Sequence, residues 1–415
     1  MAAHMPLTDA PRVLAIVQAG GKGSRMGVLT THRAKPALPF GGTHQLVDIA
    51  MSNLVNSGIS SVWVSVQYRA GTLDKHLQHG RPWDLDRNDG GFRRIVPEEI
   101  DAARTGGFAT GNADDLYRIR HQIADENADV TVVLSADQVF TLDLRDVVAA
   151  HLAKGADLTI VTTEVPVTEA SNKAVVTSDA TGKVTRIDEK PEDPAHGTIS
   201  AEVFIYRTAA LLDALDEAEK ATRPEADGED ETGLGDFAEH LIPTLVARGR
   251  VRTHALEGYW MDMGRPETYL RAHRDLVRGD VPIFDDEAWP MRTLATNKCA
   301  ARVREGAVVD ASYLSPGCDI SGTVRRSVLG PGVIVRAGAV VEDAVVLDGA
   351  VIEKGAEVRT AIVDVDVAVR RDARVGAAPA ATKARDADIA VIGAGATVRG
   401  VVKPGEQIEP GDVVG

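Results

Sequence analysis

Between residues 328 and 358 the chain repeats a short apolar pattern every six residues. One apolar residue recurs at the same position of each repeat, and a glycine or alanine stands two residues before the next such position. This period is typical of a β-helix, in which each hexad forms one short strand and a turn, and three hexads close a triangular coil. We expect the apolar side chain to point into the prism and the small residue to permit the tight corner. The apolar positions are Val328, Ile334, Val340, Val346, Ile352 and Val358, and the small ones are Gly332, Gly338, Ala344, Ala350 and Ala356.

The same step of six extends beyond this run in both directions. Val303 and Val309 precede it, and Val363, Val369 and Val375 follow it one residue out of phase. A single coil cannot bury its apolar face, so stacked coils must supply the core. A β-sandwich would alternate with a period of two. The sequence therefore predicts a left-handed parallel β-helix over residues 301–415.

The first two thirds of the chain follow a different pattern, in which buried strands alternate with amphipathic helices. This alternation favours an α/β fold with a largely parallel sheet. We expect a domain over residues 12–280 and a linker over 281–300, which contains Trp289–Pro290. The expected strands are Val13–Gln18, Val62–Val66, Val130–Ser135 and Leu158–Val165, and the expected helices are Leu46–Ser57, Asp114–Asp125 and Leu144–Lys154.

The overall charge is acidic. With 46 basic and 61 acidic residues, the formal net charge of -15 argues against nucleic acid as the main partner. The stretch Asp213–Gly233 is rich in Asp and Glu, and we expect it to be a solvated loop.

Cysteine content and hydropathy restrict the cellular setting. The two cysteines, Cys299 and Cys318, cannot form a disulfide framework, and no Cys/His spacing suggests zinc. No apolar run approaches the roughly 20 residues of a membrane span. We therefore expect a cytoplasmic protein without a membrane partner.

A glycine-rich segment follows the first expected strand. Gln18–Met26 reads Gln-Ala-Gly-Gly-Lys-Gly-Ser-Arg-Met. Glycines directly after a buried strand let backbone N–H groups approach a phosphate closely. The segment fails the dinucleotide fingerprint because Met26 stands at the third glycine, and it lacks the Gly-Lys-Ser/Thr ending of a P-loop. Arg25 and the following His32–Ala37 add cations, so a triphosphate cradle is plausible here.

These residues open a series of motifs that resembles the ADP-glucose pyrophosphorylases, also called glucose-1-phosphate adenylyltransferases. The similarity covers nearly the whole chain and keeps the family's order. The motifs are Gly20-Gly-x-Gly-x-Arg25, Arg33-Ala-Lys-Pro-Ala37, Phe40-Gly-Gly-x-x-x-Leu-Val-Asp48, Ser52–Ile59, Gln67-Tyr68, Leu134–Phe140, Glu189-Lys-Pro191, Asp236-Phe237, Leu241-Ile-Pro243, Tyr259–Gly264 and Trp289-Pro290.

The resemblance implies a Rossmann-like nucleotidyltransferase domain with a mostly parallel mixed sheet, acting on a nucleoside triphosphate and a sugar 1-phosphate. Asp137, at the carboxyl end of a strand, and Asp262, beside Trp260, are the expected Mg²⁺ ligands, because Mg²⁺ is held by one or two carboxylates plus phosphate oxygens. Arg25 is expected to hold the β- and γ-phosphates, Lys190 the sugar phosphate, and Glu189 the sugar hydroxyls. The remaining expected residues are Gly20, Gly21, Gly23, Lys35, Gly111 and Asp114 for the nucleotide, with Lys35 alternatively for an anionic effector, and Ser200 and Glu202 for the sugar.

Four segments depart from the family pattern, and they concern the base and the sugar. On the base side, Pro97-Glu-Glu-Ile100 stands where the family has a motif with two glutamines. Phe108–Asp114 stands where the family has a segment that contains a further aromatic residue and an arginine. The sugar-side segments are Ser171-Asn-Lys-Ala-Val175, where the family has Ser-x-Phe-Gly-Val, and Ser200–Phe204. In these two segments Ala174 and Glu202 replace glycines. The phosphate-and-metal half of the site is therefore expected to be intact and the specificity half altered.

Three functions follow from this division. The first is synthesis of a nucleoside diphosphate sugar, by default ADP-glucose from ATP and glucose 1-phosphate. The second keeps the chemistry with another base or sugar, and the third is a regulatory subunit with weak turnover. Acyl transfer by the β-helix is disfavoured because no histidine follows His273. The resemblance also implies a homotetramer, or a hetero-oligomer with a paralogue, and an anionic metabolite effector.

Overall fold

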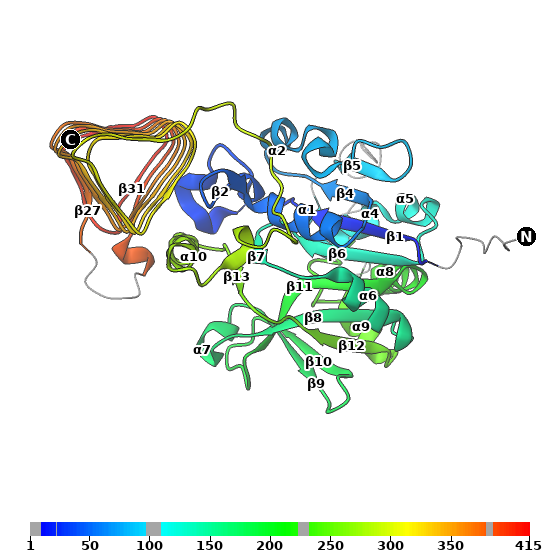
Figure 1. The fold of residues 1–415 in the computed structure, drawn as a ribbon. Helices are drawn as coiled ribbons and strands as arrows, with labels where there is room; N and C mark the ends of the chain where they lie inside the picture. The colour runs from blue at the N-terminus through cyan, green and yellow to red at the C-terminus, as the bar shows by residue number, and fades with distance from the viewer. Residues whose placement is uncertain (1–9, 22, 97–108, 223–231, 379–384) are drawn as a thin grey trace, which may run out of the picture.

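The computed structural model describes residues 10–415 apart from 22, 97–108, 223–231 and 379–384, and it shows an α/β domain beside a triangular β-helix (Figure 1). The described residues of the first domain form a nine-stranded sheet in the order β10-β9-β11-β6-β1-β4-β5, with β8 beside β11 and β12 beside β8. β6, β1, β4 and β5 run parallel, whereas β11 runs antiparallel to β6 and β8. The strands are β1 (Val13–Gln18), β4 (Ser61–Ser65), β5 (Gly91–Ile95), β6 (Val130–Ser135), β8 (Leu158–Glu164), β9 (Ala174–Ser178), β10 (Val184–Glu189), β11 (Thr198–Arg207) and β12 (Val251–Ala255).

Helices cover both faces of this sheet because successive side chains of its strands point to opposite sides. In β1, Ala15 and Val17 pack into one core, and Leu14 and Ile16 pack into the other. The first core includes α1 (Leu46–Asn56), α2 (Ala70–Leu77) and α6 (Leu144–Ala153). The second includes α4 (Asn112–Arg118), α5 (Arg120–Asp125), α8 (Thr208–Thr222) and α9 (Leu241–Ala247).

Most expected elements agree with the structure to within one residue. The helix expected over Asp114–Asp125 is divided into α4 and α5 at Ile119, which has φ -100° and ψ 7°. The expectation of a loop over Asp213–Gly233 was wrong for its first part, because α8 continues to Thr222. Ala214, Leu215 and Ala218 recur at helical spacing on its buried face, so packing of that face outweighs the acidic composition.

The C-terminal domain consists of three parallel sheets that form the sides of the prism in Figure 1. Their order confirms the predicted left-handed β-helix. One sheet contains β14 (Arg302–Val303), β17 (Asp319–Ile320), β20 (Ile334–Val335), β23 (Val351–Ile352), β26 (Ala368–Val369), β29 (Thr397–Val398) and β32 (Val413–Val414). The second contains β15 (Val308–Asp310), β18 (Thr323–Arg325), β21 (Val340–Glu342), β24 (Glu357–Arg359), β27 (Arg374–Gly376) and β30 (Val401–Val402). The third contains β16 (Tyr313–Leu314), β19 (Val328–Leu329), β22 (Val345–Val346), β25 (Ala361–Val363), β28 (Ala390–Ile392) and β31 (Gln407–Ile408).

The inward phase of the repeat differs from the expectation in its first half. Leu329, Val335 and Val341 lie in the prism core, one residue after the expected positions. From Val346 onward the expected residues are the inward ones. The cause is coil length: Val340 pairs with Glu357, so this coil has 17 residues, one fewer than three hexads. Because many strands carry two consecutive apolar residues, the period of six persists in the sequence while the inward phase shifts.

The corner residues shift in the same way. Gly332 and Gly338 have φ of 74° and 73° and form corners as expected. Ala344, Ala350 and Ala356 instead lie in the prism core. In that half the left-handed positions are occupied by the preceding residues Asp343, Gly349 and Gly355.

The two domains share an apolar interface. α10 (Pro266–Arg278) and the hairpin of β2 (Pro39–Phe40) and β3 (His44–Gln45) lie next to the prism in Figure 1. Met26 and Leu270 of the α/β domain belong to one buried cluster with Ile362 and Val391 of the β-helix. None of the described helices is long and apolar enough to cross a bilayer.

Candidate active site

Two aspartates expected to hold a metal lie together at the carboxyl edge of the sheet. Asp137 follows β6 and precedes β7 (Gln138–Phe140). β7 pairs antiparallel with β13 (Trp260–Asp262), and this register sets Asp262 opposite Gln138. The Trp260 indole N–H donates to Gln138 Oε1 at 2.9 Å, which fixes the pair of strands. Strand pairing thus joins residues 125 positions apart into one site.

Lys35 bridges these two carboxylates. Its Nζ lies 2.6 Å from Asp137 Oδ2 and 3.3 Å from Asp262 Oδ1, and the residue is only 6% exposed. Burial acts to lower the pKa of the Lys35 ammonium, but the two carboxylates outweigh it and raise the pKa above its usual value. Lys35 is therefore a fixed positive charge. In the structure Lys35 contacts the two aspartates, whereas the sequence suggested that it binds a substrate phosphate or an anionic effector.

Two further side chains hold the carboxylates. Ser135 Oγ donates to Asp137 Oδ1 at 2.5 Å. Lys173 donates to Asp262 Oδ2, and its ammonium lies 5.2 Å from the centre of the Trp260 ring. Burial would raise the pKa of Asp262, but Lys35 and Lys173 hold it below the ordinary range. Sequence reasoning missed Lys173, although the Ser171–Val175 segment already marked its surroundings as unusual.

Two adjoining cavities of about 190 Å³ each open at this edge. One is lined by Trp260, Gly264 and Arg265, and the other by Glu189, Lys190 and Glu202. Both contain Arg25, Asn172, Lys173 and Asp262. The shared residues mark the place where ligands in the two cavities would meet.

The carboxylates suit a hard divalent cation. Within the described part of the chain, no group of three or more His, Cys, Asp and Glu side chains could hold a metal ion. Asp137 and Asp262 offer carboxylate oxygens, a donor set that fits Mg²⁺ completed by water and phosphate oxygens. The residues present are therefore compatible with the expected Mg²⁺.

The glycine segment begins where β1 ends. Gly23 has φ 63°, and a Cβ there would lie 2.8 Å from the Lys35 Cβ, so both conformation and space favour glycine. A Cβ at Gly20 would meet the Gln67 side chain at 3.1 Å, whereas one at Gly21 would meet nothing within 4 Å. Arg25 is exposed and lines both cavities, which is consistent with a phosphate contact.

Gly111 and Asp114 lie beside this segment in a tight backbone arrangement. A Cβ on Gly111 would lie 2.2 Å from the carbonyl carbon of Gly235. The Asp114 carboxylate is fully buried and accepts from Arg118 Nε at 3.0 Å and from Thr232 Oγ1 at 2.8 Å. Asp114 therefore supports the local backbone from within the protein. Glu98 and Glu99, which depart from the family pattern on the base side, lie outside the described residues.

A neighbouring acid, Asp115, was not singled out in the sequence. It is buried and accepts from Ser65 Oγ at 2.8 Å, from Gln67 Nε2 at 3.2 Å and from Gln18 Nε2 at 3.1 Å. Burial raises the pKa of its carboxyl. Asp115 thus orients two glutamines beside the glycine segment.

The sugar-side residues converge on one cavity. Glu189 and Lys190 form an ion pair at the end of β10, and Lys190 has a left-handed φ of 46°. The hydrogen bond that Lys190 donates to the Glu189 carboxylate raises the pKa of the Lys190 ammonium. Ser200 Oγ accepts from the Glu202 backbone N–H at 3.1 Å. All four line the cavity.

Glu202 lies in an unusual backbone position. The register of β11 against β8 shifts between Ser200 and Phe204, and Glu202 has φ 52° within this bulge. Strained conformations of this kind cluster at functional sites. Burial first, and then Asp137 and Asp262, raise the pKa of the Glu202 carboxyl to about 7.

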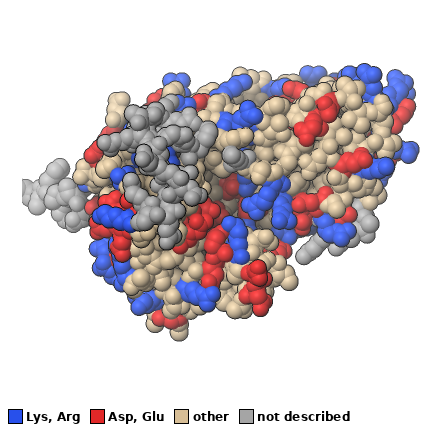
Figure 2. All heavy atoms as spheres, turned by 180° about the vertical axis from the view of Figure 1, so that it is seen from behind, with Lys and Arg blue, Asp and Glu red and all other residues tan. Residues whose placement is uncertain are grey.

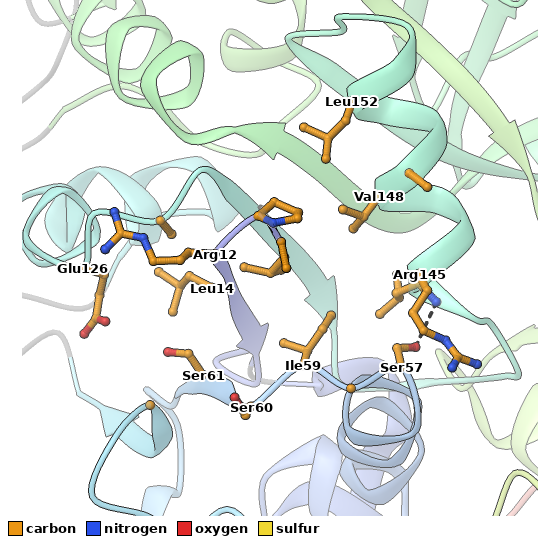
Figure 3. A pocket seen from close by; sticks show the side chains of 18 of the residues that line it. Arg12, Leu14, Ser57, Ile59, Ser60, Ser61, Glu126, Arg145, Val148 and Leu152 are labelled. Carbon is orange, nitrogen blue, oxygen red and sulfur yellow. Dashed lines mark hydrogen bonds between the residues drawn. The ribbon is translucent and has the colours of Figure 1, made fainter. Parts of the chain in front are cut away.

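A larger cavity of about 680 Å³ lies at the other edge of the sheet. Figure 3 shows Leu14, Ile59, Val148, Leu152 and Arg145 around it. It is formed by the amino ends of β1 and β4 and by α6. Ligands of α/β sheets bind outside the carboxyl ends of strands, so the smaller cavities are the better candidate site.

Surface charge agrees with a small-molecule site. On the described part of the face in Figure 2, acidic and basic side chains are interspersed without a continuous basic surface. Nucleic-acid binding would require such a surface.

Fold and site together define a nucleotidyltransferase with a hexapeptide β-helix. The model of the nucleotidyl transferase family matches residues 14–279, and that of the GlmU-like C-terminal hexapeptide matches residues 295–398. The glucose-1-phosphate adenylyltransferase of Corynebacterium jeikeium is 35% identical over 409 residues, which cover 93% of this chain and 96% of that protein. The enzymes of the same name from Fervidobacterium nodosum and Thermotoga maritima are 34% and 35% identical; the matches cover 81% and 79% of this chain and 78% and 76% of those proteins. The chain therefore belongs to the nucleotidyl transferase family, in the group of the glucose-1-phosphate adenylyltransferases.

Proposed function

We propose that this protein transfers the adenylyl group of ATP to glucose 1-phosphate and forms ADP-glucose and pyrophosphate, as in the synthesis of an α-glucan precursor. A phosphate oxygen of the sugar attacks the α-phosphorus. The bond from that phosphorus to the bridging oxygen breaks, and pyrophosphate leaves with the electron pair. The attacking oxygen is already ionised near neutral pH, so no general base is needed.

The observation that carries this proposal is the cluster of Asp137, Asp262, Lys35 and Lys173 beside Arg25. In-line transfer depends on alignment of the reactants and on neutralisation of the charge that moves onto pyrophosphate. Mg²⁺ held by Asp137 and Asp262 would supply part of that neutralisation.

The other expected residues receive roles by position. Gly20, Gly21 and Gly23 let the backbone approach the triphosphate, and Arg25 binds its outer phosphates. Gly111 and Asp114 shape the nucleotide side from within the protein.

On the sugar side, Lys190 binds the sugar phosphate. Glu189, Ser200 and Glu202 face the sugar ring.

Pyrophosphate release from a panel of nucleoside triphosphates and sugar 1-phosphates tests this assignment. We expect the highest kcat/KM with ATP and glucose 1-phosphate. Asp137→Asn is the loss control, because it keeps the side-chain shape and removes the charge. Absence of release with every pair, from a protein that still binds ATP, would contradict the proposal and favour a regulatory subunit.

A second candidate keeps the chemistry with another sugar. Glu202 and Lys173 favour it, because these two charged residues lie in the sugar-side cavity where the family has glycine and phenylalanine. Release with another sugar 1-phosphate at higher kcat/KM would select this alternative.

The family resemblance leads us to propose further properties of the whole protein. These are a homotetramer, or an assembly with a paralogous subunit, an anionic metabolite as effector and a cytoplasmic location. Sedimentation of the purified protein and assays with phosphorylated metabolites test the first three.

A further inference from the structure

Lys173 occupies the junction of the two site cavities. It lies between α7 (Val167–Ala170) and β9, and it lines both cavities together with Arg25 and Asp262. Two substrates that exchange a phosphoryl-linked group must meet at one phosphorus. In this site, such a phosphorus can contact both cavities only near these shared residues.

The Lys173 ammonium has donors to spare. An ammonium has three N–H groups, and Lys173 donates to Asp262 Oδ2. Among the described residues the structure records no second acceptor for it. The Trp260 ring lies on another side at 5.2 Å, which holds the ammonium in place by cation–π attraction. The side chain is 19% exposed, so the remaining donors can reach a ligand.

Lys35 provides an internal comparison. Its side chain is 8% exposed, and it donates to both Asp137 and Asp262. Lys35 thus contacts both aspartates, and the one negative charge that it leaves uncompensated is balanced by Lys173. Lys173 differs from Lys35 because it donates to one aspartate only and is more exposed, so its ammonium keeps N–H groups available for a ligand.

We propose that Lys173 is a further phosphate-binding residue, which donates its remaining N–H groups to the phosphate at which the two substrates meet. The inference rests on the proposed function and adds a residue to it. Glu202 lies close enough to Lys173 for the lysine to oppose the rise in the pKa of the Glu202 carboxyl.

The test compares Lys173→Met with Lys173→Arg, which retains the charge. Lys154→Met, an exposed lysine at the end of α6, is the matched control. Loss of one charge-assisted contact to the α-phosphate is expected to weaken ATP binding to the full-length protein about 10- to 100-fold by titration calorimetry. Lys173→Arg should recover most of that loss, and Lys154→Met should bind as the unchanged protein does.

In turnover, Lys173→Met should lower kcat/KM by a similar factor at an unchanged midpoint of thermal unfolding. Equal ATP affinity in Lys173→Met and the unchanged protein would overturn the inference. An unchanged protein that is inactive with every substrate pair yet binds ATP through Lys173 would reject the proposed function alone. The two failures are therefore distinguishable.

Discussion

Arg33 and Asp364 form an ion pair between the two domains: Arg33 Nη2 lies 2.5 Å from Asp364 Oδ1, and the side chains are 13% and 1% exposed. Arg33 stands two residues before Lys35, and Asp364 follows β25 of the β-helix. Burial raises the pKa of Asp364, and Arg33 opposes that rise. The segment that brings Lys35 to the paired aspartates is thus fixed to the β-helix.

Breaking this pair should destabilise the protein. Arg33→Met leaves the Asp364 carboxylate buried without its cation, and removal of one partner from a buried pair costs about 3–5 kcal/mol. We expect a lower urea midpoint for Arg33→Met and a smaller loss for Arg33→Met combined with Asp364→Asn. A single variant as stable as the unchanged protein would show that the pair is solvated.

Gly111 and Gly21 should respond differently to alanine. Gly111 has an extended backbone, so the constraint is space: its Cβ would overlap Gly235 at 2.2 Å. We expect Gly111→Ala to lose about 1–3 kcal/mol of stability, which denaturant unfolding measures. A Cβ at Gly21 meets nothing within 4 Å, so Gly21→Ala should fold normally.

Gly21→Ala should nevertheless raise KM for the nucleotide, because a methyl group would separate the backbone from the phosphates. The KM for sugar 1-phosphate should change little. Equal effects on both substrates, or none, would place the triphosphate elsewhere.

Glu202 should make stability depend on pH. Its pKa is raised from 4.5 to about 7 in the folded protein, so the fold binds this proton more tightly than the unfolded chain does. The stabilising contribution is present below pH 4.5 and is lost as the pH rises through 7. Glu202→Gln lacks this titration, so its stability should fall less between pH 5 and pH 8. Parallel urea midpoints of the two proteins over that range would refute the pKa assignment.

Local patterns predicted much of the fold. Alternation of strands and helices gave β1 and β6 their correct bounds, and the period of six predicted the β-helix. The prediction that Val328 points into the prism was wrong because the length of a coil depends on stacking between coils. The helical start of the acidic segment was missed because the buried face of α8 matters more than its composition.

The candidate site, too, could be predicted from the sequence only in part. Asp137 and Asp262 could be paired from the sequence through their motifs. The position of Lys35 between them and that of Lys173 at the cavity junction depend on side-chain packing across distant segments. The spacing of residues within one segment of the sequence does not predict such packing.

The most direct test of adenylyl transfer at Asp137 and Asp262 is the formation of ADP-glucose and pyrophosphate from ATP and glucose 1-phosphate. Phosphorus NMR with Mg²⁺ present follows both products. The unchanged protein should form both products in equal amounts, and Asp137→Asn should react at least about 100-fold more slowly at the same unfolding midpoint. Equal rates for the two proteins would contradict the assignment of the paired aspartates as the centre of the reaction.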